Sequence, residues 1–170
     1  MNEKVKQKFI ETWGAMGSLW GINTSVARVH ALLMVSEKPL GLDDISEELK
    51  ISRGNASMCL KELRNWGVIK KARETGDRRD FYLSEDDVWT MFIRIVRERK
   101  RRELDPAVDS VRKVLAESKD DGSDPKVKAR FSQMNEMLET MNSLAEAFLK
   151  SDEDAKAALS LLSNMVKMRD

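Results

Sequence analysis

The 170-residue sequence has few of the residues on which catalysis and metal binding most often depend. It contains one histidine, His30, and one cysteine, Cys59, so it cannot form an intramolecular disulfide and has no cluster of Cys and His at metal-ligand spacing. No Ser–His or Cys–His pair can be built from the spacing, and the glycines are scattered singly instead of forming a phosphate-binding loop. We therefore expect no enzymatic activity, no cofactor and no metal.

Long apolar runs are also missing. No stretch approaches the roughly 20 apolar residues of a membrane span. The N-terminal MNEKVKQKFIETW has charge but lacks the apolar core of a signal peptide. A single cysteine is typical of a reducing compartment. The sequence therefore predicts a cytoplasmic protein without a membrane partner.

Charge is nearly balanced over the whole chain, with a net value of +1. Its distribution is uneven, because residues 52–102 contain 14 Lys and Arg against eight Asp and Glu, which leaves an acidic remainder. A locally basic region in a near-neutral protein suits a surface that binds a polyanion. Ordinary solvated helix faces are the alternative explanation of this charge.

Helical periodicity covers most of the chain, and one basic hairpin interrupts it. Gly21 is expected to end the first helix, Asn23 or Thr24 to cap the second, and Asp43 or Asp44 to start a short third helix after the connection EKPLGLDD. The runs VIKKA and DFYLS, joined by RETGDRR, predict the hairpin. A long helix is expected to start at Asp86 or Asp87, and its expected buried residues are Val88, Met91, Phe92, Ile95 and Val96. Pro106 is expected to restart or kink the chain. The segment ESKDDGSDP is expected to be a linker.

Two short helices around a tight turn, followed by a hairpin, are the elements of a winged helix-turn-helix. The expected fold is mainly α with a small β-wing (α+β), consisting of a winged helix-turn-helix domain and a helical dimerisation region. We divide the chain into an N-terminal dimerisation helix at 1–22, a DNA-binding domain at 23–85, and a linker helix with a C-terminal dimerisation region at 86–170. Such a domain places one helix in the major groove of DNA.

The helix expected between the N-cap Ser52 and Gly67 is the candidate recognition helix. At 100° per residue, Ala56, Leu60 and Leu63 point to the core, and Cys59 joins them as a small buried residue rather than a redox switch. Gly54 costs stability in a helix but would allow the backbone to approach DNA closely; a neutral position in a frayed first turn is the alternative. The side chains expected to reach DNA are Arg53, Asn55, Ser57, Met58, Lys61 and Arg64.

The hairpin supplies a second set of cations, and a solvated charged turn is the alternative to DNA contact. Asp77 lies two residues before Arg79, so its carboxylate can brace the arginine before DNA arrives. The residues of the hairpin expected at the DNA are Lys71, Arg73, Asp77, Arg78 and Arg79, with Lys70 beside them.

These stretches resemble a known family. ISRGNASMCLKELRNWGVIKK, GDRRDFY and DVWTMFIRIVRERKRRELDP resemble the MarR superfamily of winged-helix regulators, and most of all its GbsR branch, which is associated with osmoprotectant genes. The resemblance spans most of the chain and is strongest over residues 42–106. It implies that Asp77 and Arg79 form the family's Asp-x-Arg wing motif, that Arg53, Asn55, Ser57 and Lys61 face DNA, and that N- and C-terminal helices form an obligate homodimer, often with an effector.

A heptad seam independently suggests a partner helix. Apolar residues recur at steps of four and three over residues 127–148, as in a coiled coil. The seam can pack within its own chain against residues 108–115 and 161–166, against a second copy, or both; we expect both. The residues expected at the dimer contact are Val5, Phe9, Trp13, Val127, Phe131, Met134, Leu138, Met141 and Phe148.

Two further features remain open at the level of sequence. Aromatic residues can cage a quaternary ammonium effector, although aromatics at helical spacing are more often core; the candidates are Trp13, Trp20, Tyr82, Trp89 and Phe92. The basic run at 97–102 either flanks DNA or is a solvated helix face, and we favour the second.

The sequence therefore predicts a homodimeric, sequence-specific regulator that binds double-stranded DNA at an inverted repeat and represses by occupying a promoter. The alternatives are a winged-helix module that binds proteins and a ligand sensor without direct DNA readout. A protein-binding module would present apolar anchors on the outward helix face, where this sequence has mainly polar and basic residues.

Overall fold

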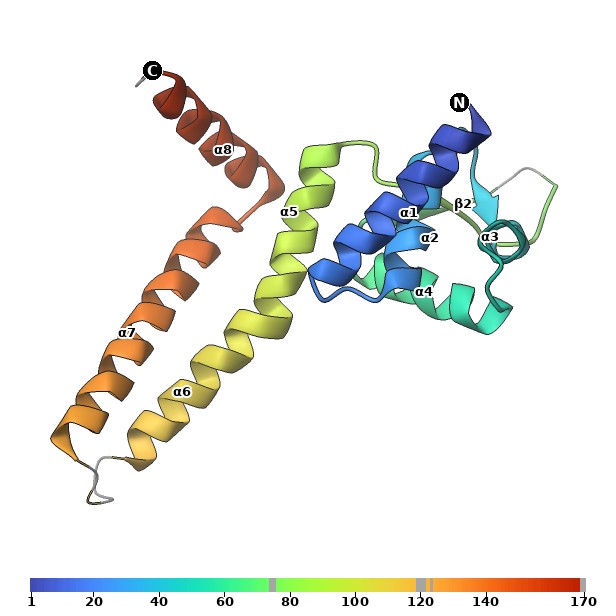
Figure 1. Ribbon diagram of the computed structural model, residues 1–170. Coiled ribbons are helices and arrows are strands. Elements are labelled where there is room, and N and C mark those ends of the chain that lie inside the picture. Colours follow the sequence, from blue (N-terminus) through green and yellow to red (C-terminus); the bar gives the residue numbers. More distant parts are fainter. Residues whose placement is uncertain (74–75, 119–121, 123, 169–170) are drawn as a thin grey trace. The chain divides into compact units, whose positions relative to one another are not determined.

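The computed structural model describes residues 1–73, 76–118, 122 and 124–168, and it divides the chain into two compact units, Met1–Met91 and Phe92–Asp170. The first unit holds the helix-turn-helix and the hairpin, and it also includes the N-terminal helix (Figure 1). Helices with one small antiparallel sheet confirm the expected mainly α fold with a β-wing. Within the described residues, no helix combines the length and apolar character needed to cross a membrane.

Helices α1 (Glu3–Leu19) and α2 (Thr24–Met34) pack closely because two glycines of α1 face α2. A Cβ atom added to Gly17 would lie 2.5 Å from the Cβ of Ala27, and one added to Gly14 would lie 2.7 Å from the Cγ of Arg28. Between the helices, Gly21 has a φ of 73°, and the Asn23 side chain accepts hydrogen bonds from the first turn of α2. The sequence analysis predicted the stop and the cap but not the role of the two buried glycines.

Helices α3 (Leu42–Leu49) and α4 (Arg53–Asn65) form the helix-turn-helix with α2. Lys50, between α3 and α4, adopts a left-handed φ of 53°. As expected, Ser52 caps α4, because its Oγ accepts a hydrogen bond from the Asn55 amide at 3.1 Å, and Gly67 follows the helix with a φ of 72°. The helix α3 starts at Leu42, one or two residues before the expected start at Asp43 or Asp44. Its N-cap is Gly41, whose amide donates a hydrogen bond to the Asp44 carboxylate in the first turn.

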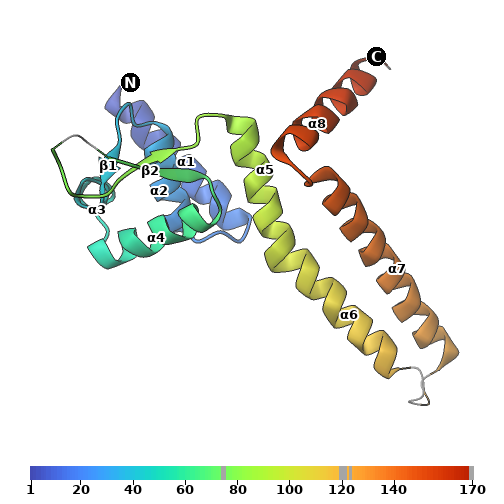
Figure 2. The same cartoon turned by 180° about the vertical axis from the view of Figure 1, so that it is seen from behind.

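The wing is part of a three-stranded sheet with the order β1-β3-β2. Strand β2 (Ile69–Ala72) pairs with β3 (Phe81–Ser84), with Lys71 opposite Tyr82, and this confirms the expected hairpin. Strand β1 (Leu40–Gly41), taken from sequence as part of a connection, adds to the other edge of β3 (Figure 2). Glu74 and Thr75 of the turn lie outside the described residues.

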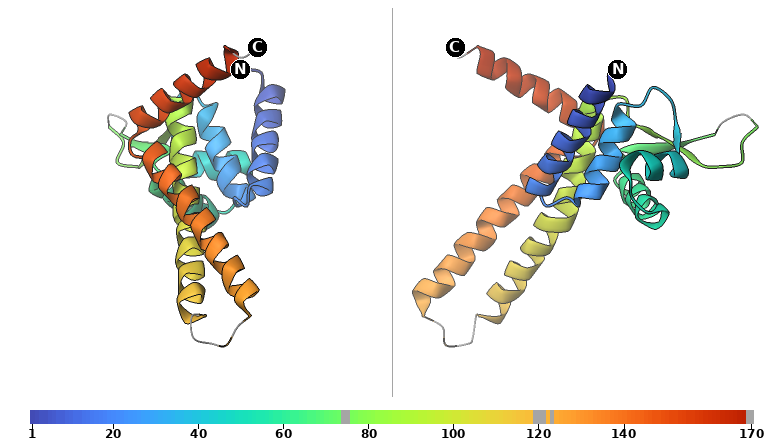
Figure 3. Two further views of the ribbon diagram at one scale, coloured as in Figure 1. Left: turned by 90° about the vertical axis from the view of Figure 1, so that its left-hand side faces the viewer. Right: turned by 45° about the vertical axis from the view of Figure 1, so that its right-hand side comes forward.

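The second unit is a set of helices. Helix α5 (Val88–Arg99), of which Phe92 onward belongs to this unit, continues through a π-helical turn, η1 (Lys100–Leu104), into α6 (Asp105–Glu117). Pro106 lies in the first turn of α6, directly after the π-helical turn, so the helix continues through it and does not restart. Helix α7 (Pro125–Phe148) returns antiparallel alongside α6 (Figure 3). Four of the nine residues of the expected linker between α6 and α7, 119–121 and 123, lie outside the described residues.

Helix α8 (Asp152–Lys167) follows α7 after a sharp change of direction and runs crosswise to it (Figure 1). Its first turn is held by Ala155, which packs with Ile93 and Leu149 in a small core. The expected inner face of α5 is partly wrong: Met91, Ile95 and Ile93 are buried, whereas Val88 and Phe92 are exposed. Apolar side chains occur around most of α5, so periodicity alone did not select the buried side.

Candidate nucleic-acid interface

Helix α4 presents the polar face that the rotation predicted. Ala56, Cys59, Leu60 and Leu63 are buried, and the opposite side is open to solvent. The exposed residues of α4 are Arg53, Gly54, Ser57, Met58, Lys61, Arg64 and Asn65. No atom lies within 4 Å of a Cβ built on Gly54, so packing within the described chain does not require a glycine at this position. Burial raises the pKa of the Cys59 thiol to about 11, so it stays a neutral thiol at physiological pH.

Asn55 differs from the exposed residues of α4, because its side chain forms hydrogen bonds within the domain. Its side chain is half-buried, and its Nδ2 donates a hydrogen bond to Ser25 Oγ at 3.3 Å, while its Oδ1 accepts one from the Cys59 thiol at 3.6 Å. Both ends of the amide are therefore engaged between α4 and the first turn of α2. This tie through Ser25 was not foreseen, because it joins residues 30 positions apart.

Arg53, the first residue of α4, is held from the preceding helix. Its guanidinium forms an ion pair with the Asp43 carboxylate of α3, while its side chain stays largely exposed. The ion pair fixes the direction of the arginine at the helix N-terminus without removing it from solvent. Asp43, which the sequence analysis considered only as a helix start, is thus part of the site.

In the wing, Asp77 braces Arg79 as expected. The Asp77 carboxylate accepts hydrogen bonds from Arg79 Nη2 at 2.7 Å, from Nε at 3.0 Å and from the Arg79 backbone amide at 2.9 Å. These hydrogen bonds hold the pKa of Asp77 below its usual value and raise that of Arg79. The guanidinium carbon also lies 5.3 Å from the centroid of the Phe81 ring, a cation–π distance.

The other cations of the wing divide into paired and unpaired groups. Lys71 pairs with Asp80, whose pKa is lowered by that hydrogen bond, and Lys70 pairs with Glu85 at 3.0 Å. The charges of Arg64 and Arg73 also act on Asp80, which places the C-terminal half of α4 near the wing. Within the described part of the chain, no ion-pair partner is found for four exposed cations of this surface: Lys61, Arg64, Arg73 and Arg78.

The basic run at 97–102 differs, because its charges are matched inside the second unit. Glu98 is buried and accepts hydrogen bonds from Arg101 and Arg102 around the π-helical turn, and these lower its pKa. Lys100 pairs with Asp105, Arg99 with Glu103, and Arg97 with Asp152. Local pairing favours the solvated-face interpretation over a second DNA contact.

The five aromatic residues considered for an effector cage differ in burial and in their ring contacts. Trp13 stacks on Phe9 at 5.7 Å between ring centroids and meets the edge of buried His30. Trp20 and Trp89 are exposed, Tyr82 is half-buried in β3, and Phe92 lies in the second unit. Among the described residues, no ring contact joins two of the five. A quaternary ammonium ligand stays a prediction.

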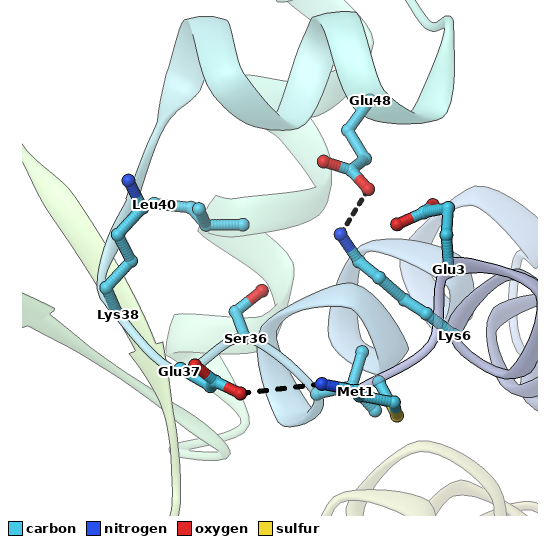
Figure 4. A pocket seen from close by; sticks show the side chains of 9 residues that line it. Met1, Glu3, Lys6, Ser36, Glu37, Lys38, Leu40 and Glu48 are labelled. Atoms are coloured by element: carbon cyan, nitrogen blue, oxygen red, sulfur yellow. Dashed lines mark hydrogen bonds and ion pairs between the residues drawn. The ribbon is translucent and has the colours of Figure 1, made fainter.

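A cleft of about 580 Å³ lies in the first unit, between the start of α1, the end of α2 and α3. Two ion pairs cross it, Lys6 with Glu48 and the Met1 amino group with Glu37 at 3.6 Å (Figure 4), whereas Glu3 and Lys38 also line it. Apolar lining comes from Val35 and Leu40. Because acidic, basic and apolar side chains are mixed in its lining, the cleft indicates no particular ligand.

The residues expected at the dimer contact are all accessible to some degree. Val5 is exposed on α1, beside half-buried Phe9 and Trp13. On α7, Val127, Met134 and Met141 are exposed, whereas Phe131, Leu138 and Phe148 are half-buried within their own chain. The division of the seam between exposed and half-buried residues agrees with the expectation that it packs partly within the chain, and the partner contact stays a prediction.

Known proteins are similar to this chain in sequence. The family model described as "Bacterial regulatory protein, arsR family" matches residues 25–71, from α2 to β2. The HTH-type transcriptional repressor GbsR of Bacillus subtilis (strain 168) is 24% identical over 115 residues, which cover 68% of this chain and 63% of GbsR. The HTH-type transcriptional repressor OpcR of the same organism is 28% identical over 91 residues, 54% of this chain and 49% of OpcR. This chain is a homologue of HTH-type transcriptional regulators.

The resemblance to GbsR-type regulators inferred from the sequence is thereby confirmed. A solved structure titled "Crystal Structure of a transcriptional regulator" aligns with this chain with a TM-score of 0.68 and 21% sequence identity. The alignment covers 85% of this chain and 95% of the chain in the solved structure. It shows that the fold is shared. The match spans about half of OpcR and under two thirds of GbsR, so the activity of a whole regulator is a proposal for this chain.

Proposed function

We propose that the protein is a sequence-specific regulator that binds double-stranded DNA through α4 and the wing. The proposal is carried by two observations: both elements present exposed cations that form no ion pair among the described residues, and one arginine is already oriented. Lys61 and Arg64 project from α4, Arg73 and Arg78 flank the described wing, and Arg79 is fixed by Asp77. Cations that neutralise phosphates provide most of the non-specific affinity for DNA.

Base readout is assigned to the N-terminal half of α4. Arg53 can donate two hydrogen bonds to guanine once the Asp43 carboxylate releases it, and Met58 offers an apolar contact for a thymine methyl group. Ser57 and Lys61, both exposed on α4, are proposed to contact phosphate. The open space around Gly54 allows backbone to come near DNA. Asn55 contacts a base only if it exchanges its hydrogen bond with Ser25.

The regulator is proposed to act in the cytoplasm as a homodimer without enzymatic activity, and to repress by occupying a promoter. A twofold dimer reads an inverted repeat with half-sites about 34 Å apart, or one helical turn. The names of GbsR and OpcR support repression. The GbsR relationship, which the sequence resemblance connects with osmoprotectant genes, is the support for an effector.

The outward face of α4 disfavours the rival module that binds proteins. Met58 is its one large apolar side chain, whereas protein interfaces are usually centred on several apolar or aromatic anchors.

The proposal is tested by the salt dependence of binding to a labelled duplex, measured by fluorescence anisotropy. Wild-type protein is expected to bind with a steep negative slope of log affinity against log salt. The double variant Lys61→Ala/Arg64→Ala should bind more weakly and with a shallower slope. Arg99→Ala, which removes a paired cation from the basic run, is the control, and its affinity and slope should match those of the wild type. If both variants lost affinity equally, the attraction to DNA would come from the overall charge of the protein and not from this surface.

A further inference from the structure

The Asp43 carboxylate lies beside α4 and near the wing, the two elements that are proposed to bind DNA. Strand β1 pairs with β3 at Gly41 and Phe81, and α3 starts at the next residue, so the first turn of α3 lies next to the wing. A Cβ atom built on Gly41 would lie 3.5 Å from the Phe81 ring, over which the Arg79 guanidinium is placed. On the other side, Asp43 forms its ion pair with Arg53, the first residue of α4.

The two acidic residues in the first turn of α3 have different partners. Asp44 accepts a hydrogen bond from the Gly41 amide at 2.8 Å and so completes the start of its own helix. Asp43 instead pairs with Arg53, and the two side chains stay 40% and 67% exposed. An ion pair this exposed contributes little to stability. Because Asp44 already serves the helix start, the pair of Asp43 is better explained by a role at the DNA.

An arginine that is paired with a carboxylate attracts phosphate weakly. The pair is nearly neutral, and a phosphate that took the Arg53 guanidinium would come within contact distance of the Asp43 carboxylate, where like charges repel. The edge of guanine differs from phosphate, because its O6 and N7 atoms accept two hydrogen bonds from arginine but carry no net charge. The carboxylate therefore penalises contact of Arg53 with phosphate more than contact with guanine.

We propose that Asp43 is a positioning residue that makes Arg53 selective for guanine. It keeps the guanidinium from the phosphates of arbitrary duplexes and releases it at a half-site that presents a guanine to the start of α4. The inference rests on the DNA-binding function proposed above and adds the residue that sets its selectivity. A charge that penalises the wrong partner is a general source of specificity.

The cations toward the other end of α4 lack this control. Lys61 and Arg64 are exposed and have no ion-pair partner among the residues that the structure describes. They are free to approach phosphate on any duplex, which gives affinity without sequence preference. The paired arginine lies at the N-terminal end of α4, the end from which a recognition helix contacts base edges. Selective readout by Arg53 requires this division of charge along the helix.

Removal of the carboxylate tests the proposal. Asp43→Asn keeps the size of the side chain and frees Arg53, so affinity for a pool of random duplexes should rise several-fold. The salt slope for that pool should steepen by about one, the value for one added phosphate contact. Affinity for a duplex enriched by selection should change less, so the ratio of the two affinities falls. Glu47→Gln removes the same charge one turn further along α3, and as the control it should leave the slope and the ratio near those of the wild type.

A double-mutant cycle shows whether Asp43 acts through the arginine. In the Arg53→Ala background, Asp43→Asn should change the affinity for random duplexes no more than Glu47→Gln does, because no guanidinium is left to free. An equal rise in affinity with and without Arg53 would overturn the proposal, since Asp43 would then act only through its own charge.

Urea unfolding distinguishes this role from a structural one. Asp43→Asn should unfold at nearly the same urea concentration as the wild type. Reduced stability with an unchanged ratio of affinities would mean that Asp43 only stabilises the helix-turn-helix, and the proposal would be wrong. If salt does not affect the binding of wild-type protein to random duplexes, the proposed function itself fails. If binding depends on salt but Asp43→Asn behaves like Glu47→Gln, only the role of Asp43 fails.

Discussion

Asp77 and Arg79 form a closed pair on the wing, in which one carboxylate accepts hydrogen bonds from two guanidinium nitrogens and from the arginine's own backbone amide. Both residues lie at the surface, where an isolated ion pair contributes little to stability. The Phe81 ring lies beside the guanidinium and limits its movement further. Together these contacts orient Arg79 before any DNA arrives, so less side-chain freedom is lost when it binds.

Arg79→Ala is expected to weaken binding to every duplex and to reduce the salt slope by about one, because one phosphate contact is lost. Fluorescence anisotropy at several salt concentrations measures both quantities. Asp77→Ala is the informative companion, since it keeps the cation but frees it; affinity should fall while the slope changes little. An unchanged slope and affinity in Arg79→Ala would remove Arg79 from the interface.

Asn55→Ala distinguishes two roles of Asn55, recognition of a DNA base and stabilisation of the domain. The substitution removes the hydrogen bonds to Ser25 and Cys59, so the free energy of unfolding should fall by about 1 kcal/mol. Ser25→Ala removes the same tie without touching α4 and should lose a similar amount. If Asn55 reads a base as well, only Asn55→Ala changes the preferred base at one position in each half-site. Equal losses at all site variants would show that Asn55 reads no base.

Gly17→Ala is expected to destabilise the first unit, because the added Cβ would meet the Ala27 Cβ at 2.5 Å and force α1 away from α2. Overpacking of this kind costs about 1–3 kcal/mol. Urea unfolding measures the loss, and Ala15→Gly on the exposed side of α1 is the control, with only the propensity cost of about 1 kcal/mol. No loss in Gly17→Ala would contradict the close crossing of the two helices.

Gly54→Ala, unlike Gly17→Ala, is expected to stabilise the fold. Its Cβ meets open space in a helical backbone, so stability should rise by up to about 1 kcal/mol. If the backbone at Gly54 comes near DNA, affinity falls although the fold is firmer. A variant that is more stable and binds DNA normally would exclude close approach at this position.

His30 should make the fold sensitive to acid. Burial lowers its pKa from 6.5 to about 4, and its Nε2 has no hydrogen-bond partner among the described residues. Because the unfolded chain binds a proton below pH 6.5 and the folded chain does not, stability is complete above that pH and is lost as the pH falls toward 4. The loss reaches about 3 kcal/mol at one unit of pKa per 1.36 kcal/mol.

Urea unfolding at pH 7 and pH 5 measures this effect, and His30→Leu supplies the comparison. The variant should lose less stability between the two pH values than the wild type does. Parallel losses in both proteins would assign the acid sensitivity to other groups.

Local signals in the sequence predicted much of the fold. Ser52 and Gly67 bounded α4 correctly because caps act within a few residues, and Asp77 with Arg79 was recognised because the two lie two residues apart. Features set by tertiary contact were missed. Strand β1 forms because Leu40 and Gly41 pair with residues 40 positions later, and Asp43 and Ser25 join the site through contacts between helices.

The central claim is that α4 and the wing read DNA, and selection of duplexes from a random pool tests it most directly. Wild-type protein would be used at about 0.15 M salt, so that electrostatic attraction alone does not retain every duplex. The account predicts enrichment of an inverted repeat whose half-sites are centred about 10 base pairs apart. No enrichment, with or without added quaternary ammonium compounds, would contradict sequence-specific binding by this surface.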